Sequence, residues 1–284
     1  ESRRSDNIED MRGHSVGSGG GMRFGVGTVI ALVVAYFLGI DPRMVLGVMQ
    51  ATQQVTPDAG PAASVPAGTP KDQAGDFVAA VLGDTEDTWT EIFRAHGMQY
   101  TPPKLVLFSQ RIQTGCGAAS SGAGPFYCPA DQRVYIDLDF YRELEQQFQA
   151  PGDFAKAYVL AHEVGHHVQN LLGITGKVDA MRGRASQQQM NALSVRVELQ
   201  ADCLAGVWAN HSQQGKGWLE RGDVESALNA ASKIGDDALQ RASQGRVVPE
   251  SFTHGSSQQR VGWFKRGMDG GSVKACDTFG RGAI

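Results

Sequence analysis

The sequence predicts an α+β domain, mostly helical with a small β-sheet, that follows one N-terminal transmembrane helix. Three observations support this fold class. Residues 24–40 form an uncharged apolar segment whose helical length is near the lower limit for crossing a bilayer core. Two short apolar runs typical of strands follow at 104–109 and 133–138. Beyond residue 150, apolar residues recur mostly at helical spacing, so helices are expected to make up the larger part of the domain.

The N-terminal quarter of the chain divides into three parts. Residues 1–23 are polar and rich in glycine, which predicts a flexible tail. The segment 24–40 is expected to be an uncleaved single-pass anchor, with a buried helix and a cleaved signal peptide as the alternatives. Four arginines precede it and only Arg43 follows closely, so the positive-inside rule predicts a cytoplasmic tail and an extracytoplasmic domain. Residues 41–73 are rich in proline and alanine and are expected to form a linker. Residues 74–284 are expected to form the folded domain.

Within the folded domain, each element is predicted from its apolar pattern and its end signals. Gly97 and Gly173 are expected to end the helices that precede them. Ser256 and Gln259 form a capping box, which is typical of a helix start. The predicted elements are, in order, a helix over 77–93, strands over 104–109 and 133–138, helices over 140–148, 154–172, 187–211 and 223–242, and a last helix after Ser256.

The composition is that of a folded protein and excludes one large class of partner. The chain has 284 residues, of which 41% are hydrophobic and 20% charged, so it is neither wholly disordered nor collagen-like. Its 26 basic residues are outnumbered by 30 acidic ones. Nucleic acid is therefore not an expected partner, because a phosphate backbone requires a basic surface.

An HExxH pattern lies in the predicted helix 154–172. His162 and His166 are four residues apart, so both imidazoles project from one helix face and can bind one Zn²⁺. Glu163 is rotated about 100° around the helix and can address a water on that metal. The alternative is a solvated face that happens to carry two histidines. The apolar residues around the pattern favour a buried helix instead, where histidines without a ligand are costly.

The third zinc ligand is expected on the helix 187–211. The extended pattern HExxHxxGxxH is excluded because Gln169 stands where it requires glycine, and His167 is expected to pack rather than bind metal. Glu198 lies in or beside the apolar stripe of the helix 187–211, and Asp202 follows one turn later. A bare carboxylate is costly to bury unless a cation compensates it, which suggests Glu198 as a ligand and Asp202 as an acceptor for a ligand histidine, expected to be His162. An ordinary ion pair, with Arg196 or another cation, is the alternative.

The chain resembles a known family at several places. HExxH followed by ExxxD on a later helix is similar to the gluzincin pattern, as in thermolysin. The segments LAHEVGHHVQNLLG, SVRVELQADCLAGVW, CGAASSGAGPFYCPADQRVYIDLDF and FTHGSSQQRVGWF resemble the bacterial neutral zinc metallopeptidases of the YpfJ type, over nearly the whole chain. The resemblance implies a zincin-like domain in which zinc is bound by His162, His166 and Glu198. It also implies that Glu163 acts as the general base on a zinc-activated water.

A tetrahedral intermediate needs a second electrophile beside the metal. His254 is the first candidate, since it precedes a capped helix and Gly255 allows close backbone approach. Tyr135, Tyr127 and Arg260 are the other candidates. A surface histidine with no role is the alternative for His254.

The four cysteines lack the short pairs of a tetracysteine zinc site. Cys116 with Cys128, and Cys203 with Cys276, are the candidate disulfides among three possible pairings, and an extracytoplasmic location favours their oxidation. Four buried thiols in a cytosolic protein are the alternative. The strand 133–138 beside the first pair is expected to be the edge that binds an extended substrate.

These observations predict a membrane-anchored zinc endopeptidase that acts on a polypeptide substrate. One alternative is a non-proteolytic, membrane-anchored protein that keeps zinc for assembly or interaction. Another is a zinc hydrolase that acts on an amide outside proteins. Glu163 favours hydrolysis, because a structural zinc site needs no general base.

Overall fold

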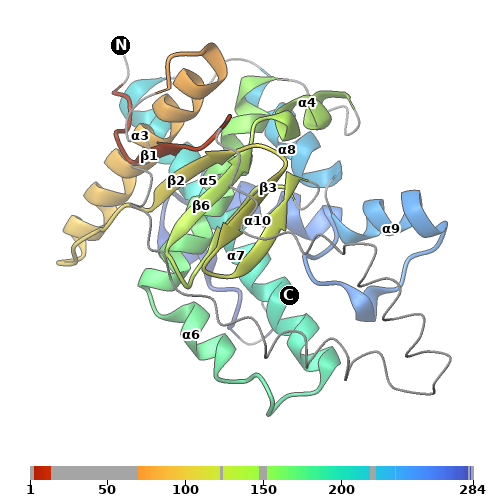
Figure 1. The fold of residues 1–284 in the computed structure, drawn as a ribbon. Helices are drawn as coiled ribbons and strands as arrows, with labels where there is room; N and C mark the ends of the chain where they lie inside the picture. Colours follow the sequence, from red (N-terminus) through yellow and green to blue (C-terminus); the bar gives the residue numbers. More distant parts are fainter. Residues whose placement is uncertain are drawn as a thin grey trace, which may run out of the picture. The chain divides into compact units, whose positions relative to one another are not determined.

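The structure, a computed structural model, describes residues 3–13, 70–121, 124–146, 152–217, 222–233, 235–280 and 282 (Figure 1). The elements, in chain order, are β1 (Ile8–Asp10), α3 (Gln73–Ala95), β2 (Lys104–Phe108), β3 (Arg111–Thr114), β4 (Gly117–Ser120), β5 (Phe126–Cys128), β6 (Arg133–Asp137), α4 (Asp139–Gln146), α5 (Asp153–Leu171), α6 (Ile174–Asp179), α7 (Gln187–Lys216), α8 (Asp223–Lys233), α9 (Asp236–Gln244) and α10 (Ser257–Gly270), with 3₁₀ turns at Pro249–Ser251 and Val273–Cys276. This is the predicted α+β class, with helices in the majority.

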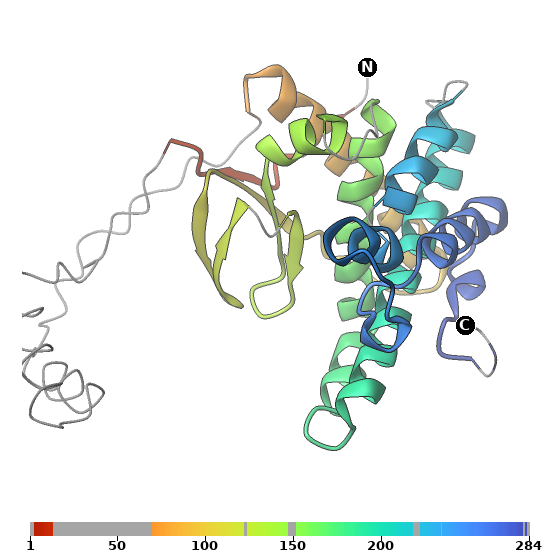
Figure 2. The ribbon, with the colours of Figure 1, turned by 90° about the vertical axis from the view of Figure 1, so that its right-hand side faces the viewer.

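The main sheet has the strand order β1-β2-β6-β5, and the long helices lie to one side of it (Figure 2). β1, β2 and β6 run parallel, while β5 pairs antiparallel with β6. Alternate residues of a strand face opposite sides. Leu105 and Val134 accordingly pack into the helical core, whereas Val106 and Tyr135 pack into a smaller cluster with Ile112 of the β3–β4 hairpin.

The helices approach one another closely at glycine residues. A Cβ atom on Gly267 of α10 would lie 1.9 Å from the carbonyl oxygen of Cys203 on α7, so only glycine fits there. A Cβ on Gly206 of α7 would likewise lie 2.1 Å from the carbonyl oxygen of Phe264. This contact of backbone against backbone holds the C-terminal half of α10 directly against the middle of α7.

Residues 3–13 are part of the folded unit, and the prediction of a flexible tail is wrong for them. β1 pairs in parallel with β2, and Ile8 is buried in the main core. The buried carboxylate of Glu86 on α3 accepts hydrogen bonds from Arg3, Ser5 and Asn7 at 2.6, 2.6 and 2.8 Å. Polar residues that looked like a solvated tail are therefore the partners of a buried charge.

The predicted membrane anchor is also corrected. Residues 24–40 lie outside the described residues, and no helix among the described residues is long and apolar enough to cross a bilayer. In addition, β1 and β2 are neighbours in one sheet. A chain that crossed the membrane once between residues 13 and 70 would place these two strands on opposite sides. The positive-inside argument counted the arginines before residue 24 as tail residues, whereas Arg3 and Arg12 form ion pairs with carboxylates of the folded unit.

The predicted helix over 223–242 is two helices. α8 ends at Lys233 and α9 begins at Asp236, after Gly235 in an extended conformation. A Cβ atom on Gly235 would lie 2.4 Å from the backbone nitrogen of Ser257, so this residue contacts the start of α10 directly. The apolar pattern continues through residues 223–242, so it did not indicate the break between α8 and α9, which the packing against α10 imposes.

Ile8→Ala is predicted to lower the free energy of unfolding by about 2–5 kcal/mol, because it removes buried methyl groups from the edge of the main core. Chemical denaturation of the full chain measures the change. Asp6→Ala is the matched control, since Asp6 is an exposed residue of the same segment. Equal stabilities of the two variants would contradict the docking of this segment.

Candidate metal centre

The local sequence places two histidines on one face of α5. The helix begins at Asp153, whose carboxylate suits the positive end of the helix dipole. It ends before Gly173, which has a φ of 72°. His162 is buried, and the side chain of His166 is 16% exposed, so both imidazoles lie at the base of a cleft rather than on a solvated face.

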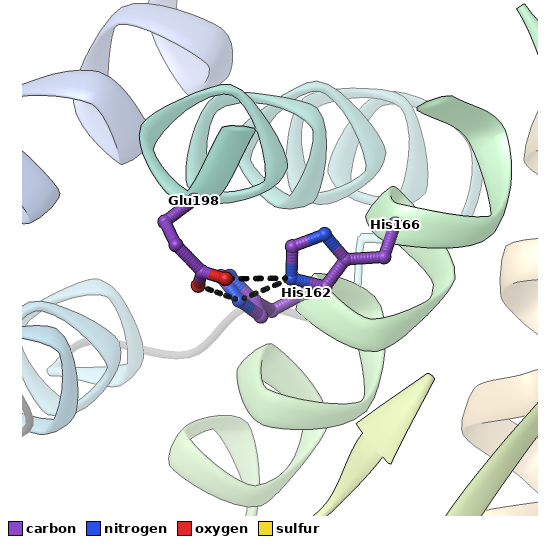
Figure 3. A group of neighbouring side chains, drawn as sticks. All are labelled: His162, His166 and Glu198. Atoms are coloured by element: carbon purple, nitrogen blue, oxygen red, sulfur yellow. Dashed lines mark hydrogen bonds and ion pairs between the residues drawn. The ribbon is translucent and has the colours of Figure 1, made fainter. Parts of the chain in front are cut away.

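The structure brings His162 and His166 together with Glu198 of α7 (Figure 3). The two Nε2 atoms lie 3.1 Å apart, and Glu198 oxygens lie 3.2 Å from Nε2 of His162 and 3.5 Å from Nε2 of His166. Zinc bonds of 2.0–2.1 Å in tetrahedral geometry put ligand atoms about 3.3 Å apart. The three atoms therefore have the spacing of three zinc ligands.

The outer ring nitrogens explain why these three atoms face one another. Nδ1 of His162 lies 2.8 Å from a carboxylate oxygen of Asp202, and Nδ1 of His166 lies 2.8 Å from the amide oxygen of Gln169. Both partners are acceptors, so each Nδ1 carries a proton. When both imidazoles are neutral, the Nε2 lone pairs of His162 and His166 point at the same position, 3.1 Å from one nitrogen to the other. The two lone pairs repel each other unless a cation lies between them. This donor set fits Zn²⁺.

Asp202 is fully buried and has three partners. Besides His162, it accepts hydrogen bonds from Tyr158 at 2.6 Å and from two guanidinium nitrogens of Arg260 at 2.9 Å each. Burial alone would raise the pKa of Asp202, but Arg260 and His162 outweigh it and lower the pKa to about 2. The carboxylate thus stays charged and holds the His162 ring.

Glu163 lies in the same cleft, which has a volume of about 520 Å³ and is also lined by His254 and Arg260. Burial raises the pKa of Glu163, although His162 and His166 oppose this change. A carboxylate whose proton affinity is raised beside a candidate metal site is suited to accept and return a proton.

Comparison with known proteins agrees with this geometry. The profile of a family described as "Putative neutral zinc metallopeptidase" matches residues 1–279. The chain belongs to this family. It is 51% identical to the protein YpfJ of Escherichia coli strain K12, over 98% of this chain and 97% of that protein. It is 41% identical to the protein Rv2575 of Mycobacterium tuberculosis strain H37Rv, over 86% of this chain and 85% of that protein. No solved structure matches it significantly.

In this member of the zinc metallopeptidase family, the candidate electrophiles Tyr127 and Tyr135 both donate their hydroxyl protons to other residues. His167 contacts the carbonyl oxygen of Thr101 through Nε2 at 2.7 Å, so its Nδ1 accepts the hydroxyl proton of Tyr127 at 3.0 Å. Tyr135 donates to Asp131 at 2.7 Å and packs in the cluster on the other face of the sheet. Neither hydroxyl is directed at the cleft as a donor.

His254 lines the cleft and has a partner that the sequence did not suggest. Its Nδ1 lies 3.2 Å from Oδ1 of Asp236, in the first turn of α9. The other oxygen of Asp236 accepts the backbone N–H groups of Thr253, His254 and Gly255 at 2.7, 2.6 and 3.0 Å. Asp236 therefore holds both the loop and the ring.

The edge strand beside the cleft is β5, and the prediction that 133–138 forms this edge is wrong. β6 (Arg133–Asp137) lies between β2 and β5. The cleft is lined by residues 124–127 and by Pro129, which belong to β5 and its flanks. The strand Phe126–Cys128 is short and follows a glycine-rich loop, so no alternating apolar pattern marks it.

The structure contains the two disulfides expected from the sequence, Cys116–Cys128 and Cys203–Cys276. The first connects the β3–β4 turn to β5. The second connects α7, one residue after Asp202, to the 3₁₀ turn Val273–Cys276. The extracytoplasmic location stays a prediction, which these bonds favour.

Zinc binding to the metal-free protein is predicted to release protons at pH 7. Burial lowers the pKa of His162, but Asp202 and Glu198 outweigh it and raise the pKa to about 10. Below that pH a proton on Nε2 competes with zinc, so the apparent affinity should rise by up to about tenfold per pH unit. Calorimetric titration in buffers of different ionisation enthalpy counts the protons.

Asp202→Asn is the control for this prediction, because it removes the charge that raises the pKa of His162. It should release fewer protons and show a shallower pH dependence. Zinc binding with no proton release in the unmodified protein would contradict the prediction.

Proposed function

We propose that this protein is a zinc-dependent endopeptidase that hydrolyses peptide bonds in the cleft beside α5. The observation that carries the proposal is the buried carboxylate of Glu163 next to three converging ligand atoms. His162, His166 and Glu198 would hold the zinc ion. When bound, zinc would lower the pKa of a water molecule and polarise the peptide carbonyl group.

Glu163 is the proposed general base and acid. Its raised pKa allows the carboxylate to take a proton from the attacking water. The protonated carboxyl group can then give that proton to the departing amine. Glu163 belongs to the same helix as His162 and His166, so its position relative to the metal ligands is fixed by α5 itself.

His254 is proposed to donate a hydrogen bond to the oxyanion that forms on the carbonyl oxygen. The hydrogen bond to Asp236 raises the pKa of His254, which favours a protonated, donating imidazole. Arg260 also lines the cleft, but two of its guanidinium nitrogens bind Asp202. The proposal therefore gives Arg260 the task of holding Asp202.

An extended polypeptide is the proposed substrate, bound along β5. A strand at the edge of a sheet offers backbone N–H and C=O groups for pairing, which holds a peptide without requiring a particular sequence. Among the described strands, β5 pairs with β6 alone, and residues of β5 line the cleft. The bond Cys116–Cys128 fixes the end of this strand.

A zinc-binding protein without peptidase activity is the second candidate. A structural zinc site is closed by four protein ligands, whereas a catalytic site has three and keeps one position open. Among the described residues, the group of candidate ligand side chains has three members. The number of ligands therefore favours a catalytic zinc site over a structural one.

Glu163→Gln is predicted to retain zinc and to lower peptide hydrolysis by at least about 10²-fold, because the amide cannot accept the proton. The assay uses the full chain and a reduced, alkylated protein as an unfolded substrate, with bound zinc measured by atomic absorption. Glu250→Gln is the matched control, since Glu250 is an exposed glutamate in the turn Pro249–Ser251. Undiminished hydrolysis by Glu163→Gln would contradict the proposed role.

His254→Ala is predicted to lower kcat by about 10²–10³-fold with zinc content unchanged, as expected for the loss of an oxyanion donor. His96→Ala, an exposed histidine at the end of α3, is the control and should keep full activity. A kcat within about twofold of the unmodified protein would assign the oxyanion contact to another group.

A further inference from the structure

Gln169 is a buried polar residue that the reaction itself does not use. It lies on α5, three residues after His166, and none of its surface is exposed. Its amide oxygen lies 2.8 Å from Nδ1 of His166. Its amide nitrogen donates to the carbonyl oxygen of Val197 at 2.7 Å and to the side-chain oxygen of Gln200 at 3.0 Å.

These contacts fix which way the amide group points. The carbonyl oxygen of Val197 can only accept a hydrogen bond, so the atom that faces it must be the amide nitrogen. The amide oxygen then faces His166 and can only accept, which places the proton of His166 on Nδ1. Nε2 is left with its lone pair directed at Glu198 and His162, as a metal ligand requires.

Gln169 also connects the two helices that carry the candidate ligands. Val197 directly precedes Glu198 on α7, so the hydrogen bond from Gln169 sets the distance between the backbone of α7 and the ring of His166. Gln200 in turn donates to the carbonyl oxygen of Cys276 at 2.9 Å. A buried series of hydrogen bonds thus runs from the metal ligands to the disulfide-linked segment.

We propose that Gln169 is a positioning residue of the metal centre, which fixes the tautomer of His166 and the place of Glu198. It is the neutral counterpart of Asp202, which performs the same task for His162. The inference rests on the proposed zinc site. A carboxylate at position 169 would still accept from His166, but it would lose the hydrogen bond to Val197.

Three variants of the full chain test this proposal: Gln169→Met, Gln169→Glu and Gln200→Met. Zinc affinity is measured by competition with a chelator, and ligand geometry by the visible absorption of the Co²⁺-substituted protein. Gln169→Met should weaken zinc binding by about 10–100-fold and change the Co²⁺ spectrum, because the ring of His166 loses its acceptor. Gln169→Glu should weaken binding by less than about tenfold, since it keeps the acceptor for His166 but loses the hydrogen bond to Val197.

Gln200→Met is the matched control, because it removes a buried amide from the same series without touching a candidate ligand. Its zinc affinity should stay within about threefold of the unmodified protein. Equal weakening by Gln169→Met, Gln169→Glu and Gln200→Met would show a merely structural role and overturn the proposal. Unchanged affinity in Gln169→Met would overturn it as well.

Nitrogen NMR of the unmodified zinc protein gives a test that does not depend on the folding of a variant. His166 should carry its proton on Nδ1 and bind the metal through Nε2, and the reverse assignment would overturn the proposal. If the unmodified protein bound no zinc, the proposed function itself would fail. Zinc binding that is unaffected in Gln169→Met would remove only the role of Gln169.

Discussion

The close packing of α5 on α7 is the constraint on which the candidate metal centre depends. Gly165 lies inside the HExxH segment, and a Cβ atom there would lie 3.0 Å from the carbonyl oxygen of Ala201. A side chain at this position would require the backbone of α7, which carries Glu198, to give way by a few tenths of an ångström. The ligand spacing of 3.1–3.5 Å therefore depends on a glycine that takes no part in the chemistry.

The buried charges around this contact balance one another. Asp202 is a fully buried carboxylate, and leaving such a group unpaired would cost several kcal/mol. Arg260 compensates it from α10, which Gly206 and Gly267 allow to lie directly against α7. The packing of α10 on α7 thus determines the charge of Asp202, and through it the orientation of His162.

The sequence predicted those parts of the site that depend on spacing within one helix. His162, Glu163 and His166 follow from the geometry of a single helix, and Glu198 with Asp202 from the apolar stripe of another. The resemblance to the zinc metallopeptidase family is confirmed by the matched family profile. The long helices were predicted for the same reason, because their apolar residues repeat at a regular interval.

The remaining parts depend on contacts between distant residues, which local patterns do not contain. β1 has three residues and pairs with a strand that begins at Lys104, so nothing near Ile8 indicated a strand. Gln169 counted only as a mismatch to the extended zinc motif, although its amide lies between His166 and α7. Asp236 lay in what the sequence presented as one uninterrupted helix.

The two sides of the cleft are held in different ways. The metal side consists of buried side chains on long helices, whereas the side chain of His254 is 51% exposed and lies on a loop. That loop depends on the carboxylate of Asp236, which accepts three backbone N–H groups. Burial opposes the charge of Asp236, but His254 and these N–H groups lower its pKa below the ordinary value.

The sign of that pKa change determines the pH range in which the loop is held. A carboxylate whose pKa is lower in the folded state contributes its full stabilisation above the unfolded pKa and loses it as the pH falls through the folded value. The contribution of Asp236 to holding the loop is therefore fully present at neutral pH and declines in acid. The hydrogen bond with Asp236 meanwhile raises the pKa of His254, so the imidazole keeps its proton to higher pH than an isolated histidine. One carboxylate thus holds the proposed oxyanion donor in place and favours its protonated form.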